Sequence, residues 1–317
     1  MKKEFDIFTI ADLCADVILI SRSIEPEFGQ KEKFVDDYIV ELGGSCSIFA
    51  SQAAKLGLKT AIIGNVGNDI FGNLIVKKLN DAGVNIRYIN RRDDIKTSIS
   101  AILCKENDRA ILTYNGSIDT VTIEDIPWNV LFNCRHLHIG SYYLLKRIQP
   151  YMPYIVKQAK EHQLSVSLDV NWDPEEKWTT GLNEVFPYID IFFPNEEEAK
   201  AITGKSDVME AIEELSTLVP IVVVKQGRKG ATAQQDKHRF YCPPLEVKTV
   251  DAVGAGDSFD AGFIYGYLSG LPLEECLKIA NICGSLNTTM PGGIAGQPDI
   301  ITLKKYYKLK DIKENIN

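Results

Sequence analysis

Residues 249–263 read Thr-Val-Asp-Ala-Val-Gly-Ala-Gly-Asp-Ser-Phe-Asp-Ala-Gly-Phe. This segment carries the strongest sequence signal for the fold and the function. Two glycines flank Ala255, so the backbone can turn tightly and approach a ligand closely. A helical spacing of apolar residues follows at Phe259 and Phe263, and free N–H groups at such a helix start attract anions. Asp257 stands in that first turn, where a carboxylate opposes a phosphate but can take a proton from an attacking hydroxyl group.

The same residues also fit a plain glycine loop followed by a helix with an acidic first turn. They lack the Lys-Ser/Thr pair of a P-loop and the third glycine of the dinucleotide fingerprint. The spacing alone therefore leaves a phosphate-binding site and a purely structural loop both open.

The composition narrows the class of protein. The chain has 317 residues, is 45% hydrophobic and carries a formal net charge of −8, which allows one large domain, or one domain plus a small one. The acidic balance argues against nucleic-acid and acidic-membrane partners. Residues 1–10 match neither a signal peptide nor a spanning helix. Seven scattered cysteines without a Cys-x-x-Cys pair indicate reduced thiols and no zinc site, so we expect a cytoplasmic protein.

Strand and helix patterns alternate through most of the chain. Core strands are expected at residues 5–10, 60–64, 137–139, 165–170, 189–193 and 221–225. Helices are expected at residues 48–56, 69–80, 151–162, 196–202, 208–218, 257–268 and 273–288. This alternation predicts a doubly wound α/β fold, with a mainly parallel sheet covered by helices on both faces. Further β-rich runs at 17–21, 38–42, 97–104 and 109–114 predict extra β-structure from two regions, about 12–42 and 95–121.

Residues 251–259 resemble the C-terminal signature of the ribokinase-like (PfkB) carbohydrate kinases, Asp-Thr-x-Gly-Ala-Gly-Asp-x-Phe, with Ala252 in place of threonine. Seven further features match that family in the same order: Gly43-Gly44 with the helix end at 55–57, residues 64–72, 138–141, 169–172 and 194–198, Gly227 with Gly230, and residues 291–293. The resemblance covers nearly the whole chain. It implies one ribokinase-like domain over residues 1–317, with a small β-sheet lid from about 12–42 and 95–121 that would exclude water.

The resemblance also implies a function, ATP-dependent phosphorylation of a primary hydroxyl group of a small sugar, ribose- or fructose-like. Asp257 would be the base, and the backbone around Gly254, Ala255 and Gly256 would hold the charge that develops during transfer. The implied substrate residues are Asp16, Gly43, Gly44, Ser47 and Asn171.

The cofactors implied are ATP and Mg²⁺, and K⁺ as a candidate monovalent cation. The implied nucleotide residues are Asn195, Lys225, Gly227, Gly254, Gly256 and Asn281. Glu198 and Asn195 would organise Mg²⁺ through water, because a hard cation prefers oxygen ligands. Carbonyl groups around Asp251 and Gly292 are the candidates for the monovalent cation.

Several positions have a simpler reading. Asn195 and Glu198 also match a helix capping box, and Asp16 also fits a turn residue. Cys14 and Ser47 stand where the family often has asparagine, at positions that contact the substrate. The resemblance therefore does not indicate ribose in particular.

Three other functions remain as alternatives. A nucleoside kinase of the same fold would need an aromatic face for the base, which Trp172, Phe28 or Tyr143 could supply. A catalytically idle ligand sensor would have no need of Asp257. A dinucleotide oxidoreductase would need a glycine fingerprint after the first strand, which the chain lacks. The short lid strands could also pair across a two-fold axis and form a homodimer.

Overall fold

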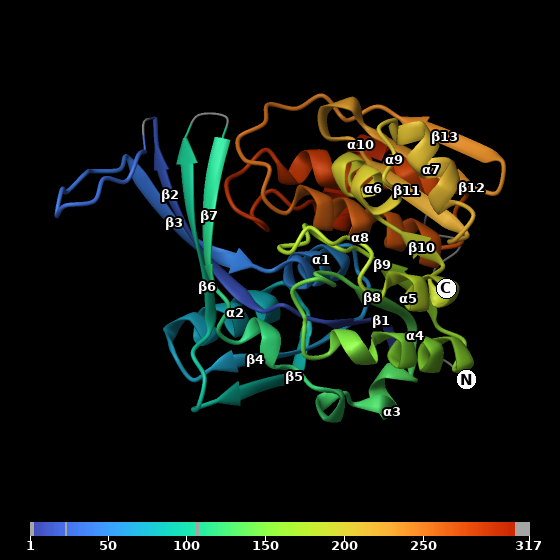
Figure 1. Ribbon diagram of the computed structural model, residues 1–317, viewed down its shortest axis with the longest axis horizontal. Coiled ribbons are helices and arrows are strands. Elements are labelled where there is room, and N and C mark those ends of the chain that lie inside the picture. Colours follow the sequence, from blue (N-terminus) through green and yellow to red (C-terminus); the bar gives the residue numbers. More distant parts are fainter. Residues whose placement is uncertain (1–2, 23, 106–107, 308–317) are drawn as a thin grey trace.

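The computed structural model describes residues 3–22, 24–105 and 108–307, which form a layered α/β body and a smaller second sheet projecting from one side of it (Figure 1). The large sheet has the strand order β13-β12-β11-β10-β9-β8-β1-β4-β5. Its strands are β1 (Phe5–Ile10), β4 (Thr60–Gly67), β5 (Asn85–Arg92), β8 (Cys134–Ile139), β9 (Ser165–Leu168), β10 (Ile191–Phe192), β11 (Ile221–Lys225), β12 (Ala231–Gln235) and β13 (His238–Cys242).

All neighbours from β11 to β5 pair in parallel, and only the β11-β12-β13 edge is antiparallel. β1 lies third from one edge, and the chain winds outward from it first through β4 and β5 and then, on its other side, through β8 to β11. The order reverses between β1 and β8, and ligands of open α/β sheets bind beyond the carboxyl ends of strands at such a point.

Helices cover both faces of the large sheet, as the sequence predicts. One face packs against α3 (Trp128–Leu131), α4 (Met152–Glu161), α5 (Leu182–Val185), α6 (Glu196–Thr203) and α7 (Val208–Leu215). The other packs against α1 (Ser45–Lys55), α2 (Ile70–Asp81), α8 (Ala255–Leu268) and α9 (Leu273–Asn287), with α10 (Ile300–Tyr307) outside α9. The doubly wound fold class is confirmed. None of the helices in the described ranges has the length and apolarity to cross a bilayer.

The second sheet has the order β3-β2-β6-β7. Its strands are β2 (Cys14–Ser21), β3 (Asp37–Gly43), β6 (Ser98–Lys105) and β7 (Asp108–Tyr114). β2 and β6 pair in parallel, and the two outer pairs are antiparallel. β2 follows β1 after three residues, and β3 leads directly into α1, so this sheet is joined to the large one beside the end of β1.

The expected elements differ from the structure mainly at the edges. β2 begins at Cys14 rather than at residue 17, so Asp16 lies within a strand and not in a turn. β5, the β12-β13 hairpin and α10 were not expected, because their sequences mix charged and apolar residues without a clean period. Two residues of the expected β6-β7 turn, 106 and 107, lie outside the described residues.

Candidate active site

Helix α8 begins directly after Gly254, a position where any residue other than glycine would be strained. Gly254 caps the helix with φ 70° and ψ 6°, and a Cβ there would lie 2.6 Å from the Gly293 carbonyl oxygen. The amide of Ala255 donates to the Ala252 carbonyl at 3.3 Å, whereas those of Gly256 and Asp257 have no acceptor among the described residues. Two free amides at a helix start form an anion-binding site.

Asp257 is held against helix α1. Its Oδ1 accepts a short hydrogen bond from the hydroxyl group of Ser45, the first residue of α1. The amides of Ser45 and Cys46 donate in turn to the carboxylate of Asp12, at 2.9 and 3.0 Å. Asp12 also accepts a hydrogen bond from Ser141 Oγ at 2.6 Å. The start of α1, the start of α8 and the end of β1 are thereby fixed relative to one another.

The double glycine lies against two carboxylates. A Cβ on Gly43 would lie 2.1 Å from Asp16 Oδ1, and a Cβ on Gly44, whose φ is 84°, would lie 2.1 Å from the Asp12 carbonyl oxygen. Gly43 and Gly44 therefore allow Asp16 and Asp12 to approach the backbone more closely than any side chain would permit. Asp16, Gly43 and Gly44, all expected to bind the substrate, do come together here.

The remaining residues expected to bind the substrate lie around the same network. Asn171 follows β9 with φ 59°, and its Nδ2 donates to Ser141 Oγ at 3.1 Å. Ser47 is fully buried in α1, and its Oγ has no hydrogen-bond partner among the described residues. A buried hydroxyl group without a partner is costly, so Ser47 is available to a bound ligand only if the site opens toward it.

Two of these carboxyl groups titrate near neutrality. Burial raises the pKa of Asp257 to about 7, and the charge of Asp169 adds to the rise, while Ser45 and Lys225 oppose it. Burial also raises the pKa of Asp16 to about 7, with Asp12 adding to the rise and Arg109 opposing it. A carboxylate with a pKa near the working pH is suited to general base catalysis.

We expect kcat/KM to rise with pH through about 7 and to level off above it, because the base accepts a proton only when ionised. Asp16, a predicted substrate residue, is expected to steepen the same limb, since its ionised form accepts hydrogen bonds from hydroxyl groups better. Initial rates from about pH 5 to about pH 9 at subsaturating sugar measure this. A rate that is flat over that range would contradict the assignment of Asp257.

A cavity of about 640 Å³ adjoins the start of α8. Lys225, Gly227, Gly256 and Asn281 line it, together with the apolar residues Leu245, Val247 and Phe259. Asn281, on α9, donates from Nδ2 to the Cys242 carbonyl oxygen at 3.3 Å, which orients its amide at the cavity wall. An apolar wall at one end and free amides at the other suit a base and a phosphate chain. Four of the six residues expected at the nucleotide therefore line one cavity.

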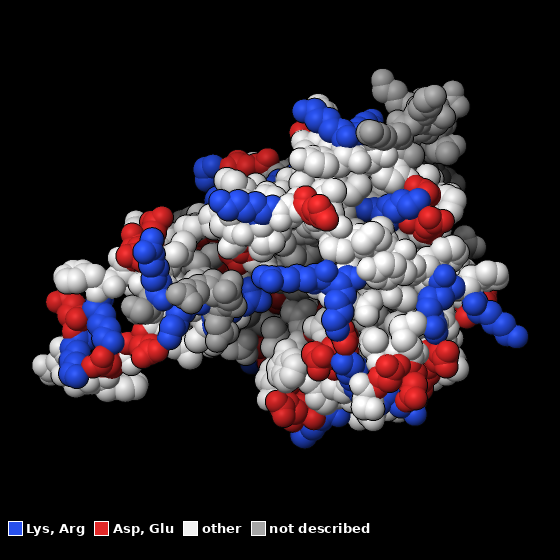
Figure 2. Space-filling view, turned by 90° about the horizontal axis from the view of Figure 1, so that it is seen from above, with Lys and Arg blue, Asp and Glu red and all other residues white. Residues whose placement is uncertain are grey.

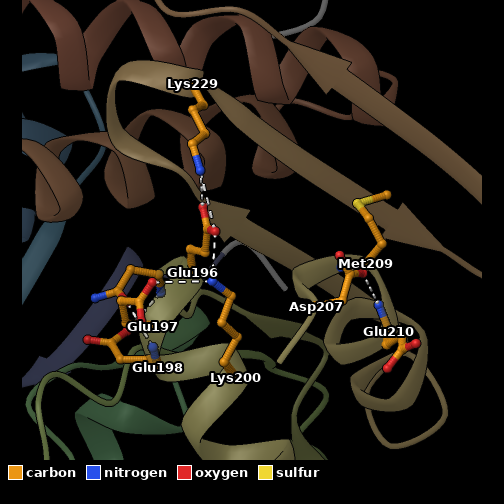
Figure 3. A network of polar contacts seen from close by, with 9 residues as sticks. Glu196, Glu197, Glu198, Lys200, Asp207, Met209, Glu210 and Lys229 are labelled. Atoms are coloured by element: carbon orange, nitrogen blue, oxygen red, sulfur yellow. Dashed lines mark hydrogen bonds and ion pairs between the residues drawn. The ribbon is translucent and has the colours of Figure 1, made fainter. Parts of the chain in front are cut away.

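Asn195 and Glu198 form the capping box that their spacing also predicts. Asn195 Oδ1 accepts from the Glu198 amide at 2.9 Å, and Glu198 Oε2 accepts from the Asn195 amide at 2.8 Å. Burial raises the pKa of Glu198 to about 7, with Asp169 adding to the rise. On the same helix turn, Glu196 lies between Lys200 and Lys229, at 2.8 and 3.2 Å (Figure 3).

Asp251 joins the loop before α8 to the loop after α9. Its Oδ1 accepts from the Val253 amide at 3.0 Å, and its Oδ2 accepts from the Gly292 amide at 2.9 Å. Both residues proposed for the monovalent cation are thus in direct contact. The side chain of Asp251 is already engaged, so carbonyl groups would have to supply the ligands.

A second cavity, of about 930 Å³, lies between the second sheet and the loop of residues 249–252. Arg22, Arg109 and Arg228 line it from three separate segments. Figure 2 shows Lys and Arg side chains gathered around the hollow between the projecting sheet and the body. The sequence gives no periodic signal for this group, because the three arginines are far apart in the chain and meet only in the fold.

The three aromatic residues considered for a nucleobase fall in different places. Tyr143 is 3% exposed, and its hydroxyl group donates to the Trp178 carbonyl oxygen, so it presents no face to a ligand. Phe28 is 99% exposed, in the segment between β2 and β3. Trp172 is 53% exposed and follows Asn171, edge-on to Trp178. Among these three, only Trp172 offers a face close to the site.

The sequence interpretation missed three site residues. Ser45 holds Asp257, Ser141 joins Asp12 to Asn171, and Asp260 pairs with Lys225. Ser45 directly follows the double glycine, and its place beside that motif could have indicated that it belongs to the site. Ser141 ends the matching segment 138–141, which was likewise an available signal. Asp260 gives no sign of its contact with Lys225, because that partner is distant in the sequence.

Comparison with known proteins shows the family of the chain. The model of the pfkB family of carbohydrate kinases matches residues 5–300. The chain belongs to the pfkB family. As a member it is an ATP-binding sugar kinase, an enzyme that transfers a phosphoryl group to an alcohol group, and the resemblance drawn from its motifs is confirmed.

Relatives within the pfkB family act on different sugars. The chain is 24% identical over 318 residues to an ATP-dependent 6-phosphofructokinase of Thermoanaerobacterium thermosaccharolyticum, covering 98% of this chain and 96% of the relative. It is 29% identical over 251 residues to an ATP-dependent ribose-1-phosphate kinase of Halopiger xanaduensis, covering 79% and 81%. A solved E. coli structure, a putative ribokinase II in complex with ATP and Mg²⁺, matches with a TM-score of 0.84 and 25% identity, covering 96% and 99%.

Proposed function

We propose that this pfkB kinase phosphorylates a primary hydroxyl group of a small sugar, ribose- or fructose-like, with Asp257 as the base. The observation that carries the proposal is the start of α8. There a carboxyl group with a pKa of about 7 lies beside two free amides and is held in place by Ser45. This arrangement supplies a proton acceptor and an anion site at one point, as phosphoryl transfer requires.

Each residue of the site has a separate task in this reaction. Asp16 would accept hydrogen bonds from the sugar hydroxyl groups, and Gly43 and Gly44 would hold the sugar beside it, since they let Asp16 and Asp12 lie close against the backbone. Asp257 would take the proton of the attacking hydroxyl group. The amides of Gly256 and Asp257 would hold the negative charge of the transferred group. The lid formed by the second sheet would exclude water, which would otherwise compete as acceptor.

The residues present fit ATP and Mg²⁺. The cavity with Gly227, Gly256 and Asn281 has room for a nucleotide. Asn195 and Glu198 would organise Mg²⁺ through water, since Glu198 keeps one oxygen free of the capping box among the described contacts. The metal would supply charge neutralisation between the phosphate oxygens. The contact of Asp251 with Gly292 also supports a K⁺ site built from nearby carbonyl groups.

One observation favours a particular kind of acceptor. Arg22, Arg109 and Arg228 surround the cavity beside Asp251, and guanidinium groups bind phosphate and carboxylate. Two of the relatives are named for sugar phosphates. A phosphorylated or acidic sugar is therefore the second candidate acceptor, beside a neutral sugar.

The test is ADP release from Mg-ATP across neutral sugars, sugar acids, sugar phosphates and nucleosides, with the protein in K⁺ and then in Na⁺. One strong responder would fix the substrate class. Products from nucleosides alone would favour the nucleoside reading, for which Trp172 is the available aromatic face. ATP binding without turnover on any acceptor would favour a sensor, and no ATP binding would refute the proposal. Equal rates in both salts would remove K⁺.

The second sheet supports a further proposal, a homodimer through its exposed face. Tyr38 on β3 and Leu112 and Tyr114 on β7 are all more than half exposed, and the strand register places these three large residues on one face of the sheet. We expect sedimentation equilibrium to give twice the chain mass, and Leu112→Asp to shift the equilibrium toward monomer. A monomeric wild-type protein at micromolar concentration would contradict this.

The seven free cysteines support the proposed cytoplasmic location, since reduced thiols persist there.

A further inference from the structure

A buried lysine lies beneath the anion-binding turn of α8. Lys225, the last residue of β11, places its Nζ 2.6 Å from Asp169 Oδ2 and 3.2 Å from Asp260 Oδ2. The three side chains are 14%, 6% and 1% exposed. The second oxygen of Asp260 has no hydrogen-bond partner among the described residues. We call Lys225, Asp169 and Asp260 the buried charge cluster.

Stability does not explain such a cluster. Removing charges from water costs more than their mutual attraction returns, and apolar residues of similar size would stabilise the fold as well or better. Titratable groups with strongly perturbed environments gather at functional sites. The position of the cluster fits this, because a Cβ on Gly256 would lie only 3.6 Å from Lys225 Nζ. Gly256 supplies one of the two free amides, and Asp260 follows Asp257 by one helical turn.

The three members of the cluster differ in how burial and their neighbours shift their pKa values. The pKa of Lys225 is raised because the attraction of Asp169 and Asp260 outweighs its burial, so the ammonium group stays charged at all working pH values. Burial raises the pKa of Asp260 well above its usual range, and Lys225 opposes this rise. Burial also acts on Asp169, but Lys225 offsets it and leaves the pKa of Asp169 below its usual value. Lys225 is therefore a fixed positive charge within the cluster.

We propose that Lys225 is a positioning residue of the phosphoryl-transfer site, whose fixed positive charge beneath the first turn of α8 keeps Asp257 ionised and able to act as the base. This inference rests on the proposed function. The charged and titratable groups that face Asp257 come from β1, α1, β9, β11 and α8 itself, and they are Asp12, Cys46, Asp169, Lys225 and Asp260. Lys225 is the one cation among them, so its loss leaves Asp257 facing acidic groups alone.

The decisive variant is Lys225→Met, which keeps the length of the side chain and removes its charge. The acid limb of the kcat/KM profile is expected to move up by about one pH unit, a tenfold loss on that limb. Turnover should recover by about pH 9, where Asp257 ionises in the variant as well. Lys229→Met is the matched control. Lys229 is 73% exposed and pairs with Glu196, and a surface pair of this kind contributes little, so its profile should match the wild type.

A second readout needs no substrate. Carbon-13 NMR of labelled aspartate carboxyl groups, with the Asp257 signal identified by Asp257→Asn, titrates the base directly and should show the same upward shift in Lys225→Met. An unmoved Asp257 titration overturns the inference, as does a loss of rate that is equal at every pH. If the wild-type protein turns over no acceptor, the proposed function fails, while the titration still decides the role of Lys225.

The removal of Lys225 alone leaves the buried carboxylate of Asp169 with the Asn171 amide but without a cation, so Lys225→Met could fail to fold. The pair Asp169→Asn and Asp169→Asn/Lys225→Met then isolates the same charge without a stranded carboxylate. The double variant should titrate Asp257 about one pH unit above Asp169→Asn. Equal titrations in the two variants would overturn the inference.

Discussion

Asp257→Asn is expected to lower turnover by about 10²–10⁴-fold, while ATP binds nearly as it does to the wild type. The amide keeps the shape of the carboxylate and its contact with Ser45, but it cannot accept the proton of the attacking hydroxyl group. The amides of Gly256 and Asp257 remain, so the anion site is preserved. Single-turnover rates and nucleotide affinity, measured by fluorescence titration, separate the two effects.

The fold should not suffer from this change. Burial raises the pKa of Asp257 in the folded state to about 7, so above that pH its ionised form is less favourable folded than unfolded. A neutral asparagine should therefore leave thermal stability at about pH 8 equal or higher. Asp207→Asn is the matched control, since Asp207 caps α7 away from the site (Figure 3). Asp257→Asn with near-normal turnover would refute the base assignment.

Gly44→Ala is expected to destabilise the protein by about 3 kcal/mol and to weaken sugar binding. The new Cβ would lie 2.1 Å from the Asp12 carbonyl oxygen, a separation that real Cβ atoms do not reach, and φ is 84°. Relief requires the end of β1 or the start of α1 to move, and Ser45, which holds Asp257, begins that helix. Urea unfolding gives the stability, and KM for the sugar gives the binding.

Gly57→Ala separates backbone strain from the clash. Gly57 follows the other end of α1 with φ 95°, but no atom lies within 4 Å of its Cβ position. It should cost only about 1 kcal/mol, from the unfavourable φ alone, and it should leave KM for the sugar unchanged. Equal losses of stability in the two variants would contradict the close approach of Gly44 to Asp12.

The sequence predicted the fold class because its core strands carry a strong local signal. The apolar runs at β1, β4 and β8 to β11 are buried on both faces, and each is separated from the next by a helical period. β5 carries Asn85, Arg87, Arg91 and Arg92, because it is an edge strand with polar contacts, so its pattern resembles a loop. Edge elements are less buried, so their sequences lack the regular spacing of apolar residues by which a strand or helix is predicted.

The site was predictable where its chemistry is contiguous in the chain. Gly43-Gly44 and residues 251–257 each form one short segment, and the structure brings these two segments together through the hydrogen bond from Ser45 to Asp257. Lys225 and Asp260 are 35 residues apart, and their contact depends on how β11 and α8 pack. No local pattern encodes such a pairing. The arginines of the second cavity escaped prediction for the same reason.

The junctions between the two sheets have a mechanical consequence. The chain passes from the body into the second sheet at residues 11–13 and returns at Gly43-Gly44. It enters again at residues 93–97 and returns at 115–117, so any hinge motion of that sheet must bend these four segments. Asp12, Asp16 and Gly43 lie at these junctions. The hinge and the proposed sugar pocket therefore share residues. A sugar bound between Asp16 and Gly44 would restrict the motion of the segments that connect the two sheets. Sugar binding and closure of the second sheet would then be directly coupled, without other residues in between.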